Sequence, residues 1–437
     1  MYNFYQLVLI IPMDMTTQIT MEKKQMYAIA VVAILIIAGI AVALVLTKDK
    51  SGGGDDREPY VGLALTNDLF SGHTCCIIGA RAGYLDGNSD TVKAFLDAYS
   101  DAVVEISMAL KDKSSQNYTK LIDVAKNRVA MPDSLTDDQK KAAIESALGN
   151  VTYLYADDID GEMTELVSDV ASLAESLYNG KQIEKSAADL GFDSYEDLAE
   201  AFVDDSYMMD AVTEQYVKPE KKVTIKIAAI EGDIHQIAMW YAKDTGIFGN
   251  YNIDITVSGQ AGGPGVYTAL NSADCDIGFL GAPPMTIRSM NNADITSESA
   301  KLKIIGRVNS EGSGILLKPG EVASDYITVT TTAPGLGAKY IYNEETEKYY
   351  VFNVEKWGGQ IIATPGAATI QHVQLSQLAS MMGLKFESYI TGMSRSSDTL
   401  YYVAGVSSFA NFVNTRATSP EIVGYIIWEA QYSIGLQ

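Results

Sequence analysis

The residues best suited to hold a small ligand stand where predicted strands end. His235 and Gln236 come shortly after Val223–Ile227, where apolar and polar residues alternate as in a strand, and they begin a run with helical spacing. A neutral imidazole or an amide at a helix start can donate a hydrogen bond to a ligand oxygen. We therefore expect His235 and Gln236 to contact a ligand. The alternative is that they cap the helix or lie on the surface.

A second group of candidates lies between another predicted strand and the helix that follows it. Small residues there leave backbone N–H groups accessible, and free N–H groups at a helix start attract anions. The alternative is an ordinary helix cap. The candidates in this turn are Thr364, Gly366, Ala367, Ala368 and Thr369, whose hydroxyl could also bind.

The remaining candidates also follow predicted strands. Gly281 and Ala282 come after Asp276–Leu280 and would bring backbone groups close to a ligand. Pro283, with the proline after it, shapes a rigid turn without N–H donors, so its predicted role is geometric. Glu429, at the end of the last predicted strand, is expected to line the same cleft, with burial in the core as the alternative.

The sequence assigns no residue to catalysis, to a metal or to a cofactor. The turn Gly262–Gly265 lacks the lysine of a phosphate-binding loop and the spacing of a dinucleotide site. Three cysteines, Cys75, Cys76 and Cys275, are too few for a disulfide framework and lack zinc-ligand spacing, so we expect them to be buried. The net charge of −23 argues against nucleic acid as a partner, although backbone N–H groups can still bind a small anion.

The elements that position the candidates alternate between strand and helix from residue 222 onward. This order predicts an α/β unit with a parallel sheet, and ligands bind beyond the carboxyl ends of such strands. The predicted elements are strand 223–227, a helix ending at Gly246, strand 253–257, a helix after Gly262–Gly265 and strand 276–280.

The remaining elements are predicted from periodicity, caps and breakers. The block from 61 to 217 is mostly helical, and residues 326–354 form a β-rich excursion. The predicted helices are 91–110 (capped near Ser89 or Asp90), 137–148, 162–179, 195–202 and 371–382, and the predicted strands include 72–81, 303–309, 311–317, 359–363 and 422–430.

At these residues the chain resembles a known family. His235, Ala242, Gly246 and Phe248, then Asp276–Gly278, Gly281, Pro283 and Pro284, follow the motif order of the solute-binding proteins that serve nitrate, sulfonate, taurine and thiamine-precursor ABC importers. The run Gly72–Arg81 resembles the returning strand of that family, and Ile422–Ala430 resembles its last strand of the second lobe, with Ala430 in place of the usual proline. The resemblance implies two α/β lobes with a ligand between them.

The family segments occur here in an unusual order. The part that resembles the family's C-terminal portion, 61–217, precedes the part that resembles its beginning, 222–437. Circular permutation explains this order, and it is tolerated where the original termini lie close together. A remnant of a tandem duplication and an assembly error in the gene are the alternatives.

The N-terminal part carries an uncharged run from Tyr27 to Thr47 that has the length of a membrane-spanning helix. Lys23 and Lys24 precede it, which predicts a cytoplasmic amino end and an exported body. We expect an uncleaved anchor, with Met21 as an alternative start. A cleaved signal peptide is the competing interpretation, because Ala41–Ala43 resembles a cleavage site.

The fold expected from these features is a circularly permuted two-lobed α/β fold of the periplasmic-binding-protein type II class, behind a transmembrane helix. The predicted divisions are 1–26 (uncertain N-terminus), 27–47 (anchor), 48–60 (flexible linker), 61–221 (the family's C-terminal portion), 222–320 (lobe I) and 321–437 (lobe II).

The expected function is that of the substrate-binding component of an ABC importer, outside the cytoplasm and without enzymatic activity or a cofactor. The resemblance implies a small organic anion, an oxyanion or a thiamine-precursor-like solute, with a permease and an ATPase as partners. Two alternatives remain open. One is an enzyme similar to the eukaryotic pyrimidine-precursor synthases, and the other is a sensor or scaffold whose cleft binds nothing.

Overall fold

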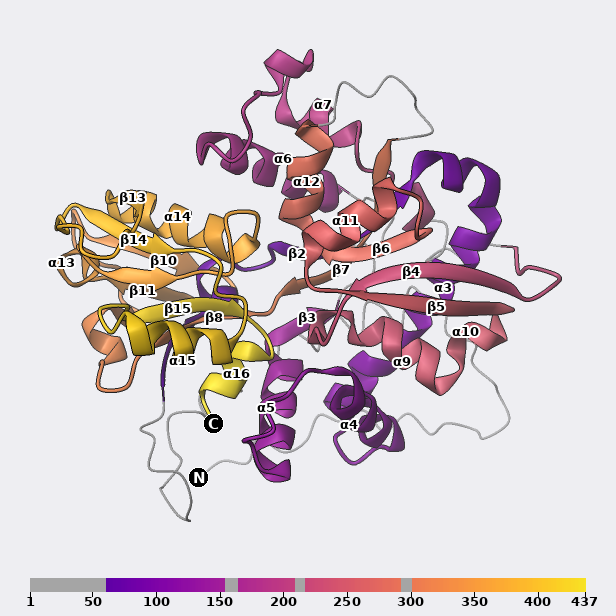
Figure 1. Cartoon of the computed structure of the whole chain (residues 1–437), viewed down its shortest axis with the longest axis horizontal. Coiled ribbons are helices and arrows are strands. Elements are labelled where there is room, and N and C mark those ends of the chain that lie inside the picture. The colour runs from indigo at the N-terminus through magenta and orange to yellow at the C-terminus, as the bar shows by residue number, and fades with distance from the viewer. Residues whose placement is uncertain (1–59, 154–163, 209–216, 292–300) are drawn as a thin grey trace, which may run out of the picture.

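The computed structural model describes residues 60–153, 164–208, 217–291 and 301–437. The described chain is a mixed α/β protein with two six-stranded sheets and one three-stranded sheet (Figure 1). The predicted anchor at residues 27–47 lies outside the described residues. No helix in the described ranges is both long and apolar enough to cross a bilayer.

The first six-stranded sheet, here called sheet I, contains the segment that begins at Val223. Strand β4 runs parallel to β5 and to β6, and β2 runs antiparallel to β6 and to β7. In order across the sheet, its strands are β3 (Val151–Tyr153), β7 (Leu302–Glu311), β2 (Thr74–Arg81), β6 (Ile277–Gly281), β4 (Val223–Ile230) and β5 (Ile253–Gln260).

Strand β2 joins the two halves of the sequence into one core. Its Ile77 and Ile78 face opposite sides of the sheet, and neither side chain is exposed. Its partners β6 and β7 come from the second half of the chain. Residues 74–153 and 164–208 therefore share a core with the sheet that contains Val223 and do not form a separate body, whereas residues 61–65 pair in the other six-stranded sheet.

The second six-stranded sheet, sheet II, also mixes parallel and antiparallel pairs. Strand β12 runs parallel to β14 and β15, and β8 runs antiparallel to β15 and β1. In order, its strands are β1 (Val61–Leu65), β8 (Ser313–Leu317), β15 (Gly424–Trp428), β12 (Ile361–Ala363), β14 (Thr399–Val403) and β13 (Lys385–Ser388).

Alternation of apolar residues gives sheet II a core on each face. On β8, Ile315 and Leu317 pack in one buried cluster and Leu316 in another. On β15, Ile426 belongs to the first cluster and Ile427 to the second. Successive side chains of a strand point to opposite faces, so such continuous apolar runs indicate strands that are covered on both sides.

Helices cover both faces of each sheet (Figure 1). Around sheet I these are α3 (Ala82–Lys111), α4 (Gln116–Arg128), α5 (Asp137–Asn150), α6 (Thr164–Asn179), α7 (Tyr195–Glu200), α9 (Ile237–Thr245), α10 (Ile247–Asn250), α11 (Gly263–Asn271) and α12 (Ala282–Asn291). Around sheet II they are α2 (Thr66–Leu69), α13 (Val354–Trp357), α14 (Ile370–Met382), α15 (Phe409–Thr418) and α16 (Gln431–Gly435). The short 3₁₀ helices among the described residues are η1 (Ala188–Leu190), η2 (Ile234–Gln236) and η4 (Ala323–Asp325).

Local signals set several of the helix ends. Helix α9 ends at Gly246, which adopts the left-handed conformation (φ 84°) that glycine enters without steric cost. Thr136 begins α5 with a capping box to Gln139. The predicted β-rich excursion is confirmed as the small antiparallel sheet β10 (Lys339–Asn343), β11 (Lys348–Phe352) and β9 (Ile327–Thr330).

Three predicted elements differ from the structure. Helix α3 joins two helices across a kink at Asn88 (φ −137°), so the predicted start near Ser89 marks the second of them, and the helical segment from Ala82 was not predicted. Helix α4 was not predicted, and Ser115 caps it. The Pro283 pair lies in the first turn of α12 and not in a turn that ends a strand, because the first helical N–H groups need no partner within the helix.

The chain passes between the two sheets at two short connections. One joins β1 to β2, and the other joins β7 to β8 at Gly312. Glu311 and Gly312 both have positive φ, 68° and 84°. The change of sheet therefore lies at Gly312, whereas the predicted boundary between the lobes was placed after residue 320.

The first and last described residues lie close together. Tyr60 accepts a hydrogen bond from Arg416 of α15 (2.9 Å). A Cβ built on Gly62 would stand 2.5 Å from the Tyr432 hydroxyl and 3.4 Å from Leu436, so β1 starts against the chain's last helix.

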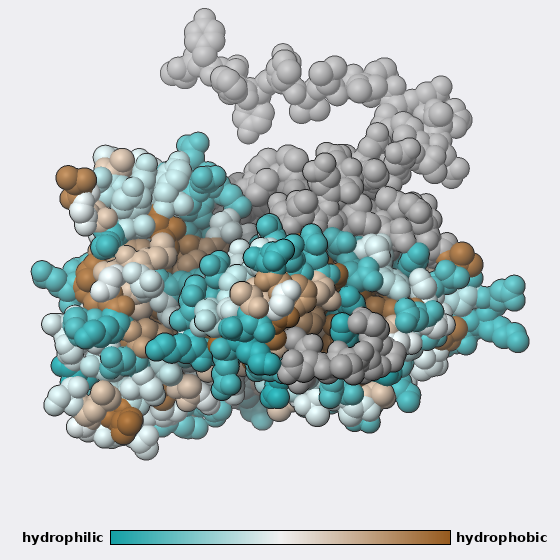
Figure 2. All heavy atoms as spheres, turned by 90° about the horizontal axis from the view of Figure 1, so that it is seen from above, coloured by the Kyte–Doolittle hydropathy of each residue, from teal (hydrophilic) through white to brown (hydrophobic). Residues whose placement is uncertain are grey.

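Seen from above, the molecule carries separate hydrophobic patches within a largely hydrophilic surface (Figure 2).

Candidate functional site

A cavity of about 490 Å³ lies between the elements that cover the two sheets. The connection between β1 and β2 contributes one wall, α6 from the side of sheet I another, and the start of α14 from sheet II a third. The lining residues are Phe70, Ser71, Gly72, His73, Thr74, Asp169, Val170, Ser172, Leu173, Ser176, Ala282, Ile370, Val373, Gln374 and Gln377.

The cavity lies where strands of both sheets end. Ala282 directly follows β6, and α14 follows β12 after a short turn. Both strands belong to parallel pairs, and the carboxyl ends of parallel strands are the usual ligand-binding edge of an α/β sheet. The position of the cavity thus agrees with the edge expected from the sequence.

Asp169 is the carboxylate of the lining that is placed to contact a ligand. Its Oδ2 accepts hydrogen bonds from Thr74 (2.5 Å) and from Nη2 of Arg307 (2.7 Å). The Arg307 side chain is 2% exposed, whereas that of Asp169 is 29% exposed. The second carboxylate oxygen, Oδ1, accepts no hydrogen bond from the described residues. Arg307 therefore holds the carboxylate from the protein side and leaves one oxygen for a ligand.

His73 and Gln374 form a second polar pair in the lining. Nδ1 of His73 lies 2.6 Å from the carbonyl oxygen of Phe70, and Nε2 lies 2.9 Å from Nε2 of Gln374. A carbonyl only accepts, so His73 donates from Nδ1 and accepts the Gln374 N–H at Nε2. This assignment leaves Oε1 of Gln374, which is buried and has no hydrogen-bond partner in the described structure.

A direct hydrogen bond spans the cavity between its two sides. Gln377 of α14 donates to Ser176 of α6 at 3.2 Å. The connection beside it is held at Glu311, whose carboxylate accepts from Asn67 (2.9 Å) and Thr152 (3.0 Å). Burial raises the pKa of Glu311, although the hydrogen bonds from the Gly72 backbone N–H and from Thr152 oppose the shift. The two sides of the cavity are thus in contact in this structure.

Among the predicted site residues, Ala282 lines the cavity, whereas His235 is buried and is not part of the lining. Nδ1 of His235 lies 2.7 Å from Asp233 Oδ1, and Nε2 lies 3.0 Å from the carbonyl oxygen of Gly312. Both neighbours only accept, so both ring nitrogens donate and the ring is an imidazolium. His235 thus ties η2 to the connection between β7 and β8.

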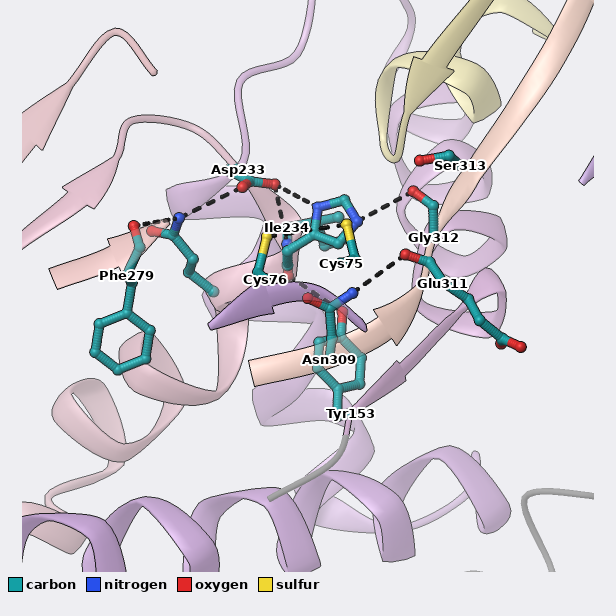
Figure 3. Close-up of polar contacts among 12 residues, drawn as sticks. Cys75, Cys76, Tyr153, Asp233, Ile234, Phe279, Asn309, Glu311, Gly312 and Ser313 are labelled. Atoms are coloured by element: carbon teal, nitrogen blue, oxygen red, sulfur yellow. Dashed lines mark hydrogen bonds and ion pairs between the residues drawn. The ribbon is translucent and has the colours of Figure 1, made fainter. Parts of the chain in front are cut away.

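Charges around His235 support this protonation state. Burial alone would lower the pKa of His235, but the Asp233 carboxylate and Cys75 raise it well above 6.5. The hydrogen bond with Cys76 lowers the pKa of the Cys75 thiol well below its usual value, against the effect of burial. The two sulfur atoms lie 4.0 Å apart (Figure 3). As expected from the sequence, all three cysteines are buried.

Gln236, Thr364 and Glu429 are also buried. Gln236 donates to the carbonyl oxygen of Phe279 (3.3 Å), and Thr364 lies 3.3 Å from Nδ1 of His372. Glu429 accepts from Asn150 (2.7 Å) and from the Ser433 backbone (3.1 Å), and burial raises its pKa. These contacts hold α5, α16 and the strand ends together, so the interpretation of Glu429 as a core residue describes it best.

The other predicted residues surround the cavity without lining it. Thr369 caps α14 by accepting from the His372 N–H and itself donates to Gly366 (2.7 Å), which is the cap interpretation. Ala367 is exposed and Ala368 is half-buried. Gly281 and Pro283 flank Ala282 at the start of α12, and Pro283 is buried. Sequence spacing therefore located the helix starts but not the lining side chains.

Sequence reasoning missed Asp169 and Gln374, and it treated His73 as a structural residue. Each lies within a helix or a connection, where polar residues usually face solvent, so no pattern set them apart. The arginine at 307, within a predicted strand, was the signal that could have led to Asp169. This arginine is buried in the structure, and a buried arginine requires an acidic partner. In the described ranges, no three His, Cys, Asp or Glu side chains are grouped to hold a metal ion.

The fold and the cavity define a mixed α/β protein with several sheets, compatible with a two-lobed α/β domain that has a cavity between its parts. Comparisons with protein-family models, with curated proteins and with solved structures found no match to this chain. The function is therefore inferred from the residues and the geometry.

Proposed function

We propose that this chain is the solute-binding component of an ABC importer, held at the cell membrane by residues 27–47 with its body outside the cytoplasm. The observation that carries the proposal is the cavity of about 490 Å³ between two α/β parts, lined from both. That volume lies within the range of small-molecule sites. A permease and an ATPase would be the partners.

The connections between the two sheets favour a protein that opens and closes. Two short segments cross beside the cavity, and one of them turns at Gly312 with positive φ. Closure about a few connecting residues is how two-lobed binding proteins enclose a ligand. The hydrogen bond from Gln377 to Ser176 would form on closure and break on opening.

The order of the strands favours a circularly permuted form of the type II binding-protein fold. Strand β2 from the first half of the sequence pairs between β6 and β7 from the second half. The first described strand also starts against Leu436 near the end of the chain. Both are what a permuted chain requires, because its new ends replace a former connection.

The resemblance implies sulfonates, nitrate, taurine or thiamine precursors as solutes. The start of α14 lies at the cavity through Ile370, and a helix start provides N–H donors for an acidic group. Hydroxyl and amide groups of Ser172, Gln374 and Gln377 provide further hydrogen bonds. The site therefore supplies binding groups for a small polar solute.

Thermal denaturation of the full-length chain with this panel tests the proposal. Ligand at about a hundredfold excess over Kd stabilises a folded protein by about 2.7 kcal/mol, which is a measurable rise in Tm. Ser172 is exposed and lines the cavity, so Ser172→Trp should fill part of it and weaken binding at least tenfold. Glu175→Trp, exposed on the same helix and outside the lining, is the matched control.

Equal binding by the chain with Ser172→Trp would contradict the assignment of the site. Turnover of a probe would favour the enzyme related to pyrimidine-precursor synthesis. If no compound of the panel raises the Tm, a sensor or scaffold whose cleft binds nothing would be favoured.

A further inference from the structure

The cavity presents hydrogen-bond acceptors that the protein itself does not use. Oδ1 of Asp169 accepts nothing from the described residues, and Oε1 of Gln374 is buried without a partner. Burying Oε1 of Gln374 without a partner destabilises the folded chain, whereas Asp169 is 29% exposed, so water can reach its Oδ1. A ligand that donates to Oε1 would relieve that cost and one that donates to Oδ1 would replace water there, and an acceptor-only ligand would do neither.

The neighbours of these two acceptors fix their orientation. With a neutral His73, Gln374 presents its N–H to Nε2 of His73, because Nδ1 of His73 donates to the Phe70 carbonyl. Asp169 is held at Oδ2 by Arg307 and Thr74. The remaining oxygen of each group therefore cannot be exchanged for a donor without breaking an existing hydrogen bond.

The charge of the lining points in the same direction. The described lining residues include one carboxylate, Asp169, and no lysine or arginine. Arg307 balances that carboxylate, but its side chain is only 2% exposed and does not line the cavity. An anion without donors would meet unpaired oxygens at this wall and would have only the start of α14 to bind.

We propose that the solute bound in this cavity carries an N–H donor group, an amine or a related nitrogen group, which donates to Asp169 and Gln374. This inference rests on the proposed solute-binding function and narrows its solute class. An acidic group on the same molecule can lie at the start of α14. Nitrate and simple sulfonates, which only accept hydrogen bonds, are then poor ligands.

Matched probe pairs test the donor group on the full-length chain by isothermal titration calorimetry. The pairs are taurine with ethanesulfonate and β-alanine with propionate, which share an acidic group and differ in the amine, and ethanolamine with ethylene glycol. Nitrate is the acceptor-only reference. We expect the amine of at least one pair to bind ten times or more tighter than its partner, since a hydrogen bond to a charged group contributes about 1.5–3 kcal/mol.

Two variants connect that preference to the named oxygens. Asp169→Asn keeps the shape of the side chain and should reduce the preference for the amine about tenfold. Gln374→Met removes the second acceptor without disturbing Arg307, so it serves if Asp169→Asn does not fold. Glu175→Gln, exposed on α6 outside the lining, should leave the preference unchanged.

The outcomes separate this inference from the proposed function. A preference for amines that falls in both variants supports it. Equal or tighter binding of nitrate or of the amine-free partners overturns the donor requirement and leaves solute binding intact. If no probe binds, and no compound in the panel of sulfonates and thiamine precursors raises the Tm, both the donor requirement and the proposed solute-binding function are overturned.

Discussion

Two carboxylates of this protein each pair with a buried basic group, and they differ in how much of the pair reaches solvent. In the cluster of Figure 3, the Asp233 and His235 side chains are 6% and 2% exposed. At the cavity, the side chains of Asp169 and Arg307 are 29% and 2% exposed. The first pair is closed by protein on all sides, whereas the second presents one oxygen to a cavity.

The difference teaches that the same pair of residue types serves structure or binding according to the packing around it. Asp233 uses its oxygens for His235, for the N–H that begins η2 and for Gln236. A fully used carboxylate holds segments together and has nothing left for a ligand. Asp169 holds Arg307 with one oxygen only, so its other oxygen can accept a hydrogen bond from a ligand in the cavity.

The largest effect should come from breaking the closed pair. Asp233→Ala leaves the buried His235 charge without its counter-ion and removes the acceptor at the start of η2. Loss of one partner of a buried ion pair costs about 3–5 kcal/mol. Urea denaturation followed by circular dichroism measures this loss in the free energy of unfolding.

The matched control is an exposed pair of the same protein. Asp254 lies 3.1 Å from Lys222, and both side chains are about half exposed or more (49% and 65%). Exposed pairs contribute about 0–1 kcal/mol, so Asp254→Ala should change stability by that amount or less. Similar losses for Asp254→Ala and Asp233→Ala would show that burial does not distinguish the two pairs.

A second prediction uses pH to separate the closed pair from the cavity. The folded state raises the pKa of His235 well above 6.5, so the pair stabilises the protein fully below about 6.5. That stability is lost as pH rises through the raised value, because the folded chain holds the proton longer than the unfolded chain. This pair should therefore lower the urea midpoint between pH 6 and pH 9.

Cys75 acts in the opposite sense and has to be removed from the comparison. Its pKa is lowered in the folded state, so its contribution grows as pH rises toward the unfolded value of 9.0. The series is therefore measured in chains with Cys75→Ala, with and without Asp233→Ala. We expect the urea midpoint to change less with pH in the chain that also carries Asp233→Ala. An equal change with pH in the two chains would contradict a charged His235.

The sequence predicted the architecture better than the site. The alternation in Val223–Ile227 and the glycine at 246 correctly placed a strand and a helix end, since backbone period and left-handed caps are local properties. Strand β2 (Thr74–Arg81) lies within the strand predicted at 72–81 and pairs with β6 and β7 in sheet I. These features depend on short stretches of chain or on their order.

The lining of the cavity depends on long-range packing, which one sequence does not reveal. His235 was selected because it precedes a helix, yet Gly312, from a distant strand connection, receives its second hydrogen bond. Gln374 became a lining residue only because His73, far away in the sequence, meets it across the cavity. Helix starts were therefore found from the sequence, while the side chains that face the cavity were not.

The smallest predicted effect is on stability at the cavity wall. Gln374→Met gives up the hydrogen bond to His73, about 1 kcal/mol, and at the same time removes a buried acceptor without a partner, which costs about 1–3 kcal/mol in the wild-type chain. The two terms oppose each other, so urea denaturation should detect a change of no more than about 2 kcal/mol and no net loss of stability, in contrast with Asp233→Ala. A loss as large as that of the closed pair would mean that Gln374 supports the fold in the way Asp233 does, and the distinction between the two regions would fail.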